Sequence, residues 1–115
     1  MTTDELLKVV LETLEDGKAR DVLTLDVRGR TSIADYMVIA TGTSERHVKS
    51  LGGHVSEDAK KHHVQPLGVE GETVGDWVLV DLGDVIVHVM RAPIREFYQL
   101  EKLWQGDSAS SVHAA

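Results

Sequence analysis

Apolar side chains recur every three or four residues in three parts of the chain, a spacing typical of helices that bury one face. Threonine, serine and proline precede or open these parts, and such residues favour helix starts. The pattern predicts one helix that begins after Thr2 or Thr3 and ends near Gly17, a second from about Glu45 to His62, and a third that starts near Pro93 and places Ile94, Phe97, Leu100 and Trp104 along one side.

Shorter segments with alternating or continuous apolar residues predict extended strands. One of these segments begins with a proline, which donates no hydrogen bond to a neighbouring strand and therefore favours the edge of a sheet. The predicted strands are residues 21–27, 36–40 and 66–70, and two more within residues 76–90.

The last two strands form the most informative segment, because two apolar runs flank the turn Asp81-Leu82-Gly83-Asp84. Gly83 can adopt the positive φ that a tight hairpin turn requires. Side chains of both runs alternate between the two faces of the hairpin, and both faces are largely apolar, so the hairpin needs cover on two sides, from helices of this chain or from a partner. We expect the turn to project two carboxylates and one leucine.

These elements predict an α/β fold with a single mixed β-sheet of about five strands, in the order αββαβββα. Hairpins pair antiparallel, whereas the strand–helix–strand order in the middle requires a parallel crossover, and helices must cover at least one face. Gly52 or Gly53 would let the second helix approach the sheet closely. Residues 1–105 are expected to form one domain, and the small, polar residues 106–115 a disordered tail.

The charge balance disfavours direct contact with nucleic acid. Lysine and arginine number 12 against 19 aspartates and glutamates, which gives a net charge of −7 at pH 7. Such a chain repels phosphate backbones and attracts basic protein surfaces. Its one Phe, two Tyr and two Trp are too few for a base-stacking platform. We therefore expect a protein partner and little direct RNA contact.

The chain contains no cysteine, which excludes disulfides, zinc–thiolate sites and thiol catalysis and fits a reducing compartment. It has no apolar run of about 18 residues and no basic leader, so neither a membrane span nor a signal peptide is predicted. We expect a cytoplasmic protein without contact to a membrane.

Two segments invite a chemical interpretation, and both have a simpler structural one. The turn Thr41-Gly42-Thr43-Ser44 precedes a helix and resembles a phosphate-binding loop, but it lacks the lysine and glycine spacing of known loops. A capping turn with Ser44 as N-cap is favoured instead. Asp81 and Asp84 form an acidic pair that would suit magnesium, yet acidic residues are ordinary in hairpin turns.

Histidines offer a further candidate. His47, His54, Asp58 and His62 share one stripe of the second helix, but apolar residues occupy its buried side, so a metal site is disfavoured. His88 lies within a strand, where a hydrogen-bonded core histidine and an interface donor are both open. Trp77 is either an anchor at the rim of the core or an exposed interface anchor. No nucleophile elbow or catalytic triad is evident, and we predict no enzymatic activity, cofactor or metal.

Four blocks closely resemble the bacterial ribosomal silencing factor (Iojap-like) family: LDVRGRTSIADYMVIATGTSERHV at 25–48, PLGVEGE at 66–72, DWVLVDLGDVIVHVM at 76–90 and FYQLEKLW at 97–104. The resemblance implies a sheet related to the nucleotidyltransferase fold without its catalytic acids. It also implies a translational repressor that binds the large ribosomal subunit through its ribosomal protein number fourteen. Such a repressor blocks joining of the small subunit when nutrients are scarce.

Within this resemblance, the contact is expected on the loop and the hairpin. Carboxylates would face basic residues of the partner, and apolar side chains would supply contact area. Two alternatives stay open, a small nucleotidyltransferase-like enzyme that binds nucleotides and a module that forms a homodimer in the free state. The expected contact residues are Glu70, Trp77, Asp81, Leu82, Asp84, His88 and Met90.

Overall fold

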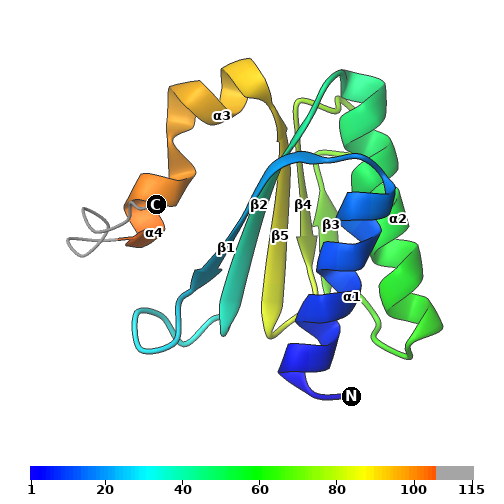
Figure 1. The fold of residues 1–115 in the computed structure, drawn as a ribbon, viewed down its shortest axis with the longest axis vertical. Coiled ribbons are helices and arrows are strands. Elements are labelled where there is room, and N and C mark those ends of the chain that lie inside the picture. Colours follow the sequence, from blue (N-terminus) through cyan, green and yellow to red (C-terminus); the bar gives the residue numbers. More distant parts are fainter. Residues whose placement is uncertain (106–115) are drawn as a thin grey trace.

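A computed structural model describes residues 1–105 of the chain. Helices and strands follow one another as the apolar pattern predicts, and Figure 1 shows their arrangement. Thr2 caps the first helix in a capping box with Glu5. The elements are α1 (Thr3–Asp16), β1 (Arg20–Asp26), β2 (Tyr36–Gly42), α2 (Glu45–Lys61), β3 (Gly68–Glu70), β4 (Trp77–Asp81), β5 (Val85–Arg91), α3 (Ala92–Tyr98) and α4 (Leu100–Gln105).

The strands form one sheet in the order β1-β2-β5-β4-β3, which confirms the predicted mixed sheet. Strands β2 and β5 run parallel, and the other neighbouring pairs of the described sheet are antiparallel. Strand β3 lies at an edge, as Pro66 led us to expect. The predicted tail, 106–115, lies outside the described residues. None of the helices in residues 1–105 is long and apolar enough to cross a bilayer.

Helices cover both faces of the sheet, but to different extents. The long helices α1 and α2 lie on one face, and the short helices α3 and α4 lie on the other (Figure 1). Alternate residues of the hairpin divide between the two cores, as predicted. Val78, Val80, Val85, Val87 and Val89 pack under α1 and α2, whereas Ile86 and Met90 belong to the core on the side of α3 and α4.

The predicted last helix is interrupted, which corrects the expectation of one continuous helix. Gln99 adopts a left-handed conformation with φ of 49° and ends α3, and α4 starts at Leu100. This change of direction lets Leu100 and Trp104 pack against the sheet. Phe97, which we expected on the same buried side, is 78% exposed.

The two adjacent glycines of α2 differ in their surroundings, and this difference yields a matched test. A Cβ on Gly52 would lie 2.6 Å from Cγ1 of Val78, whereas a Cβ on Gly53 would meet nothing within 4 Å. Alanine favours a helix over glycine by about 1 kcal/mol. We expect Gly53→Ala to raise the free energy of unfolding by about that amount. Gly52→Ala should lower it, because overpacking costs about 1–3 kcal/mol. Urea denaturation measures both, and equal effects would contradict the close approach at Gly52.

Candidate functional site

Most of the predicted contact residues share one face of the sheet. Cross-strand partners point to the same side, and Leu79 of β4 pairs with Glu70 of β3 and with His88 of β5. Trp77 pairs with Met90 in the same way. Asp81 lies two residues after Leu79 on β4, so its side chain points to the same face as that of Leu79 and away from that of Val80. The residues on this face are therefore Glu70, Trp77, Leu79, Asp81, His88 and Met90.

This face is less completely covered than the opposite one. Helix α3 packs mainly against β5 and β2, and α4 packs against β1. Near β3 and β4, Trp77 and Leu79 are half-buried and Glu70 is exposed. The half of the face at β3 and β4 thus presents one indole, one leucine and two carboxylates, those of Glu70 and Asp81. We call these four residues, Glu70, Trp77, Leu79 and Asp81, the β4 surface.

Three predicted contact residues do not reach the surface. Leu82 and His88 are each 5% exposed and Met90 is 0% exposed. The expectation that Leu82 and Met90 supply apolar contact area is therefore wrong, and His88 is not available as an interface donor. Gly83, with φ of 87°, closes the turn as predicted, and the Leu82 N–H donates to the Val85 carbonyl. This geometry directs Leu82 into the core under α1 and α2. Hydrophobic burial therefore takes the leucine that we expected the turn to project.

The two aspartates of the turn act within the fold. The Asp81 carboxylate accepts a hydrogen bond of 2.9 Å from the Gly83 N–H, which is the turn chemistry that we favoured over a metal site. Asp84 is exposed and accepts a bond of 3.0 Å from Oγ1 of Thr3 at the start of α1. Within residues 1–105, no three potential ligands gather in a way that would hold a metal ion.

Trp77 and His88 are joined by a hydrogen bond across β4 and β5. The indole Nε1–H donates to Nδ1 of His88 at 3.0 Å, and the two ring centroids lie 5.8 Å apart. His88 is 5% exposed, and its burial lowers its pKa from 6.5 to about 4. His88 is thus a hydrogen-bonded core histidine in its neutral form, with Nδ1 as acceptor. This bond fixes the orientation of the Trp77 ring at the surface.

Two aromatic residues of α3 extend the surface and were missed by sequence reasoning. The Tyr98 ring lies 5.1 Å from that of Trp77, and the Phe97 ring meets Tyr98 edge-on at 4.9 Å. Their exposed fractions are 78% for Phe97 and 56% for Tyr98. The sequence did indicate that one of these two residues is exposed. Phe97 and Tyr98 are consecutive, and a helix cannot turn two consecutive side chains toward the same narrow buried stripe.

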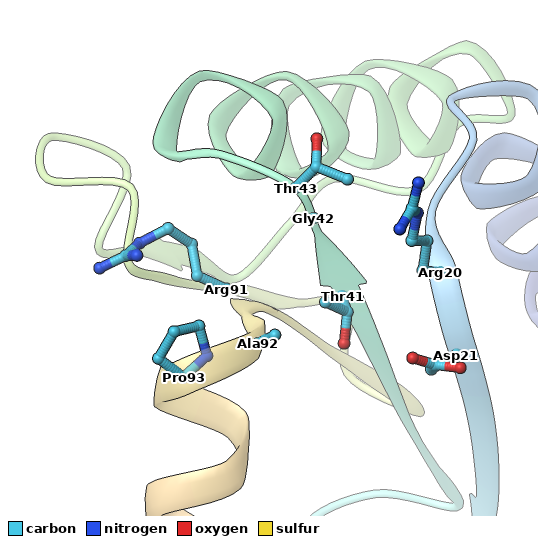
Figure 2. A pocket seen from close by; sticks show the side chains of 8 residues that line it. All are labelled: Arg20, Asp21, Thr41, Gly42, Thr43, Arg91, Ala92 and Pro93. Carbon is cyan, nitrogen blue, oxygen red and sulfur yellow. The ribbon is translucent and has the colours of Figure 1, made fainter.

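The turn at Thr41–Ser44 caps α2 with Ser44 as N-cap, which is the interpretation that we favoured over a phosphate-binding loop. Oγ of Ser44 accepts a bond of 3.0 Å from the His47 N–H. A hollow of about 300 Å³ opens beside this turn (Figure 2). The Arg91 side chain reaches away from it and pairs with Asp76 at 2.7 Å, while the Asp21 carboxylate points into it. Among its lining residues, only Arg20 then offers an uncompensated positive charge, which weakens the phosphate-binding interpretation.

Two members of the histidine stripe of α2, His47 and Asp58, connect α2 to α1 and its C-cap. Nδ1 of His47 accepts from the Thr43 N–H at 2.9 Å, so Nε2 carries the proton and donates to the Gly17 carbonyl at 2.8 Å. The Asp58 carboxylate accepts a bond of 2.6 Å from Oγ1 of Thr13 on α1. His54 and His62, the other members of the stripe, are exposed.

Comparisons with known proteins identify the family. Residues 1–114 match the family described as "Ribosomal silencing factor during starvation". The chain is 46% identical over 99 residues to the ribosomal silencing factor of Haemophilus influenzae, and this match covers 86% of this chain and 97% of that protein. It is 34% identical over 101 residues to the mouse protein named "Mitochondrial assembly of ribosomal large subunit protein 1", covering 85% of this chain and 44% of the mouse protein.

A solved structure supports the same assignment. A crystal structure of a Chromobacterium violaceum protein superposes with a TM-score of 0.90 at 44% sequence identity, over 93% of this chain and 89% of that one. The fold, the identity and the coverage agree. The chain therefore belongs to the ribosomal silencing factor family, whose members are ribosome-associated regulators of translation.

Proposed function

We propose that this chain binds the large ribosomal subunit through ribosomal protein number fourteen and sterically blocks joining of the small subunit in the cytoplasm during nutrient limitation. The family description names starvation, and the name of the mouse relative refers to the large subunit. The observation that carries the proposal is the β4 surface, where an oriented tryptophan and a leucine lie beside two carboxylates on a partly covered sheet face.

This combination suits a basic protein partner. Aromatic and apolar side chains supply the desolvated centre of an interface, and charges at the rim set the encounter rate and the register. The net charge of −7 adds long-range attraction to a basic protein and repulsion from RNA phosphates. Contact with RNA is therefore expected to be small.

The mechanism requires no turnover. One bound molecule occupies surface that the small subunit needs, so the two compete by mass action. The degree of repression then depends on the concentration of the silencing factor relative to its Kd. Neither a cofactor nor a metal enters this scheme.

Co-sedimentation with purified large subunits tests the proposed partner. We expect the full chain to sediment with large subunits and to be released as the salt concentration rises, because salt screens the attraction between opposite charges. Small subunits sedimented in parallel provide the control. A chain that stays in the supernatant with large subunits at low salt would rule out the proposal.

The carboxylates of the β4 surface give a smaller, kinetic prediction. Asp81→Asn keeps the oxygen that accepts from the Gly83 N–H but removes the charge, and Glu70→Gln removes the exposed charge on β3. We expect the double variant to associate with large subunits several-fold more slowly at low salt while dissociating at a nearly unchanged rate. Stopped-flow binding at two salt concentrations measures this, and the double variant Glu12→Gln with Glu15→Gln, at exposed positions of α1, is the matched control because it removes the same number of charges. An unchanged association rate would place these carboxylates outside the contact.

A further inference from the structure

We propose that the contact with the large subunit continues from Trp77 onto α3, where Tyr98 and Phe97 form its apolar centre. The inference rests on the proposed function and extends it to a part of the chain outside the hairpin. We call Trp77, Tyr98 and Phe97 the aromatic row, because consecutive ring centroids lie 5.1 and 4.9 Å apart.

The aromatic row leads from the core to solvent. Trp77 is half-buried and bonded to His88, Tyr98 is 56% exposed and Phe97 is 78% exposed. Phenylalanine at this exposure gains little from folding, whereas burial against a partner would remove its apolar surface from water. Aromatic residues are also enriched at interface centres and among binding hot spots.

The row is held rigidly, which lowers the entropy lost on binding. Arg95, one turn before Tyr98 on α3, donates from Nη1 to the Asp21 carbonyl at 2.6 Å and to Oγ1 of Thr41 at 2.9 Å. Its Nε donates to Glu101 of α4 at 3.1 Å. These bonds fix α3 to β1, β2 and α4, so the rings are placed before a partner arrives.

The charges around the aromatic row favour a basic protein as its binding partner. Arg91, the last residue of β5, and Arg95 of α3 are each paired with a carboxylate. Glu96 is exposed beside Phe97, and Glu70 is exposed on the same sheet face as Trp77. A basic protein surface with an apolar centre fits these features. A second copy of this chain fits less well, because two molecules with a net charge of −7 repel each other.

Affinity for purified large subunits tests the inference with full-length variants. We expect Phe97→Ala to weaken binding about tenfold, as a moderate hot spot does, and Phe97→Tyr to restore it. Leu103→Ala on α4 is the matched control, since Leu103 is similarly large and 70% exposed but lies outside the aromatic row. It should bind within about twofold of the unaltered chain. Because Phe97 is exposed, Phe97→Ala should leave the unfolding midpoint unchanged.

The outcomes separate this inference from the proposed function. If the unaltered chain fails to bind large subunits, the proposed function fails. If it binds and Phe97→Ala binds equally well, or if Leu103→Ala weakens binding as much, only the aromatic row is refuted. Sedimentation velocity of the free chain tests whether a second copy of this chain occupies the row instead. If Phe97→Ala loses self-association but still binds large subunits, the row belongs to a homodimer interface and the inference is overturned.

Discussion

Trp77→Ala is expected to weaken binding to large ribosomal subunits about thirtyfold, which corresponds to about 2 kcal/mol for a central hot spot. Trp77 is the one residue that connects the β4 surface to the aromatic row. Its indole contacts Tyr98, and its Nε1–H is bonded to His88. Truncation removes the largest apolar side chain of the proposed contact and frees the ring of Tyr98. Equilibrium binding to labelled large subunits measures the effect.

The second tryptophan of the described residues provides the control. Trp104 of α4 is also half-buried and packs on the same core, but α4 lies against β1, at the opposite edge of the same sheet face. Trp104→Ala should lower stability without a comparable loss of affinity. Affinities that fall equally in both variants would attribute the loss to general destabilisation, and unchanged binding by folded Trp77→Ala would remove Trp77 from the contact.

Acidification is expected to remove up to about 3 kcal/mol from the free energy of unfolding through His88 alone. Burial lowers the pKa of His88 from 6.5 in the unfolded chain to about 4 in the folded protein. Below pH 6.5 the unfolded chain binds a proton that the folded protein does not. The contribution of His88 is therefore complete above pH 6.5 and is lost as the pH falls toward 4. Protonation also abolishes the acceptor for the Trp77 indole.

His88→Phe isolates this effect from that of the carboxylates. Phenylalanine fills the buried site without binding a proton, so the decrease in unfolding free energy between pH 6.5 and 4.5 should be smaller than in the unaltered chain by about 2–3 kcal/mol. Urea denaturation over this pH range measures the difference. His54→Gln, at an exposed position of α2, should follow the unaltered chain. Parallel pH curves for His88→Phe and the unaltered chain would show that burial of His88 has no such consequence.

The apolar pattern predicts most of the fold because burial alternates where the side chains alternate. The assignment of Val78 and Val80 to one face and of Trp77 to the other follows from strand geometry alone. Gly83 and Ser44 could be interpreted from the chain because turns and caps have strong local preferences. The bond between Trp77 and His88, in contrast, depends on the register of β4 and β5 and is visible only in the folded protein.

The predictions from the sequence are wrong where tertiary packing overrides a local preference. Leu82 stands between polar turn residues, which favours exposure, but a core under α1 and α2 is available to it. The break at Gln99 could not be predicted, because the residue in the left-handed conformation there is not a glycine and no proline follows it. Without that break, Phe97 is assigned to a buried stripe and the aromatic row is missed. Gly52 and Gly53 likewise differ through the positions of Val78 and Val80, which approach only Gly52.

Subunit joining tests the central claim most directly. Large subunits are first incubated with increasing concentrations of the full chain, small subunits are added, and formation of whole ribosomes is followed by light scattering. We predict that joining decreases as the large subunits become saturated and that Trp77→Ala requires about thirtyfold higher concentrations for the same decrease. Normal joining by large subunits that are demonstrably saturated with the chain would contradict steric repression.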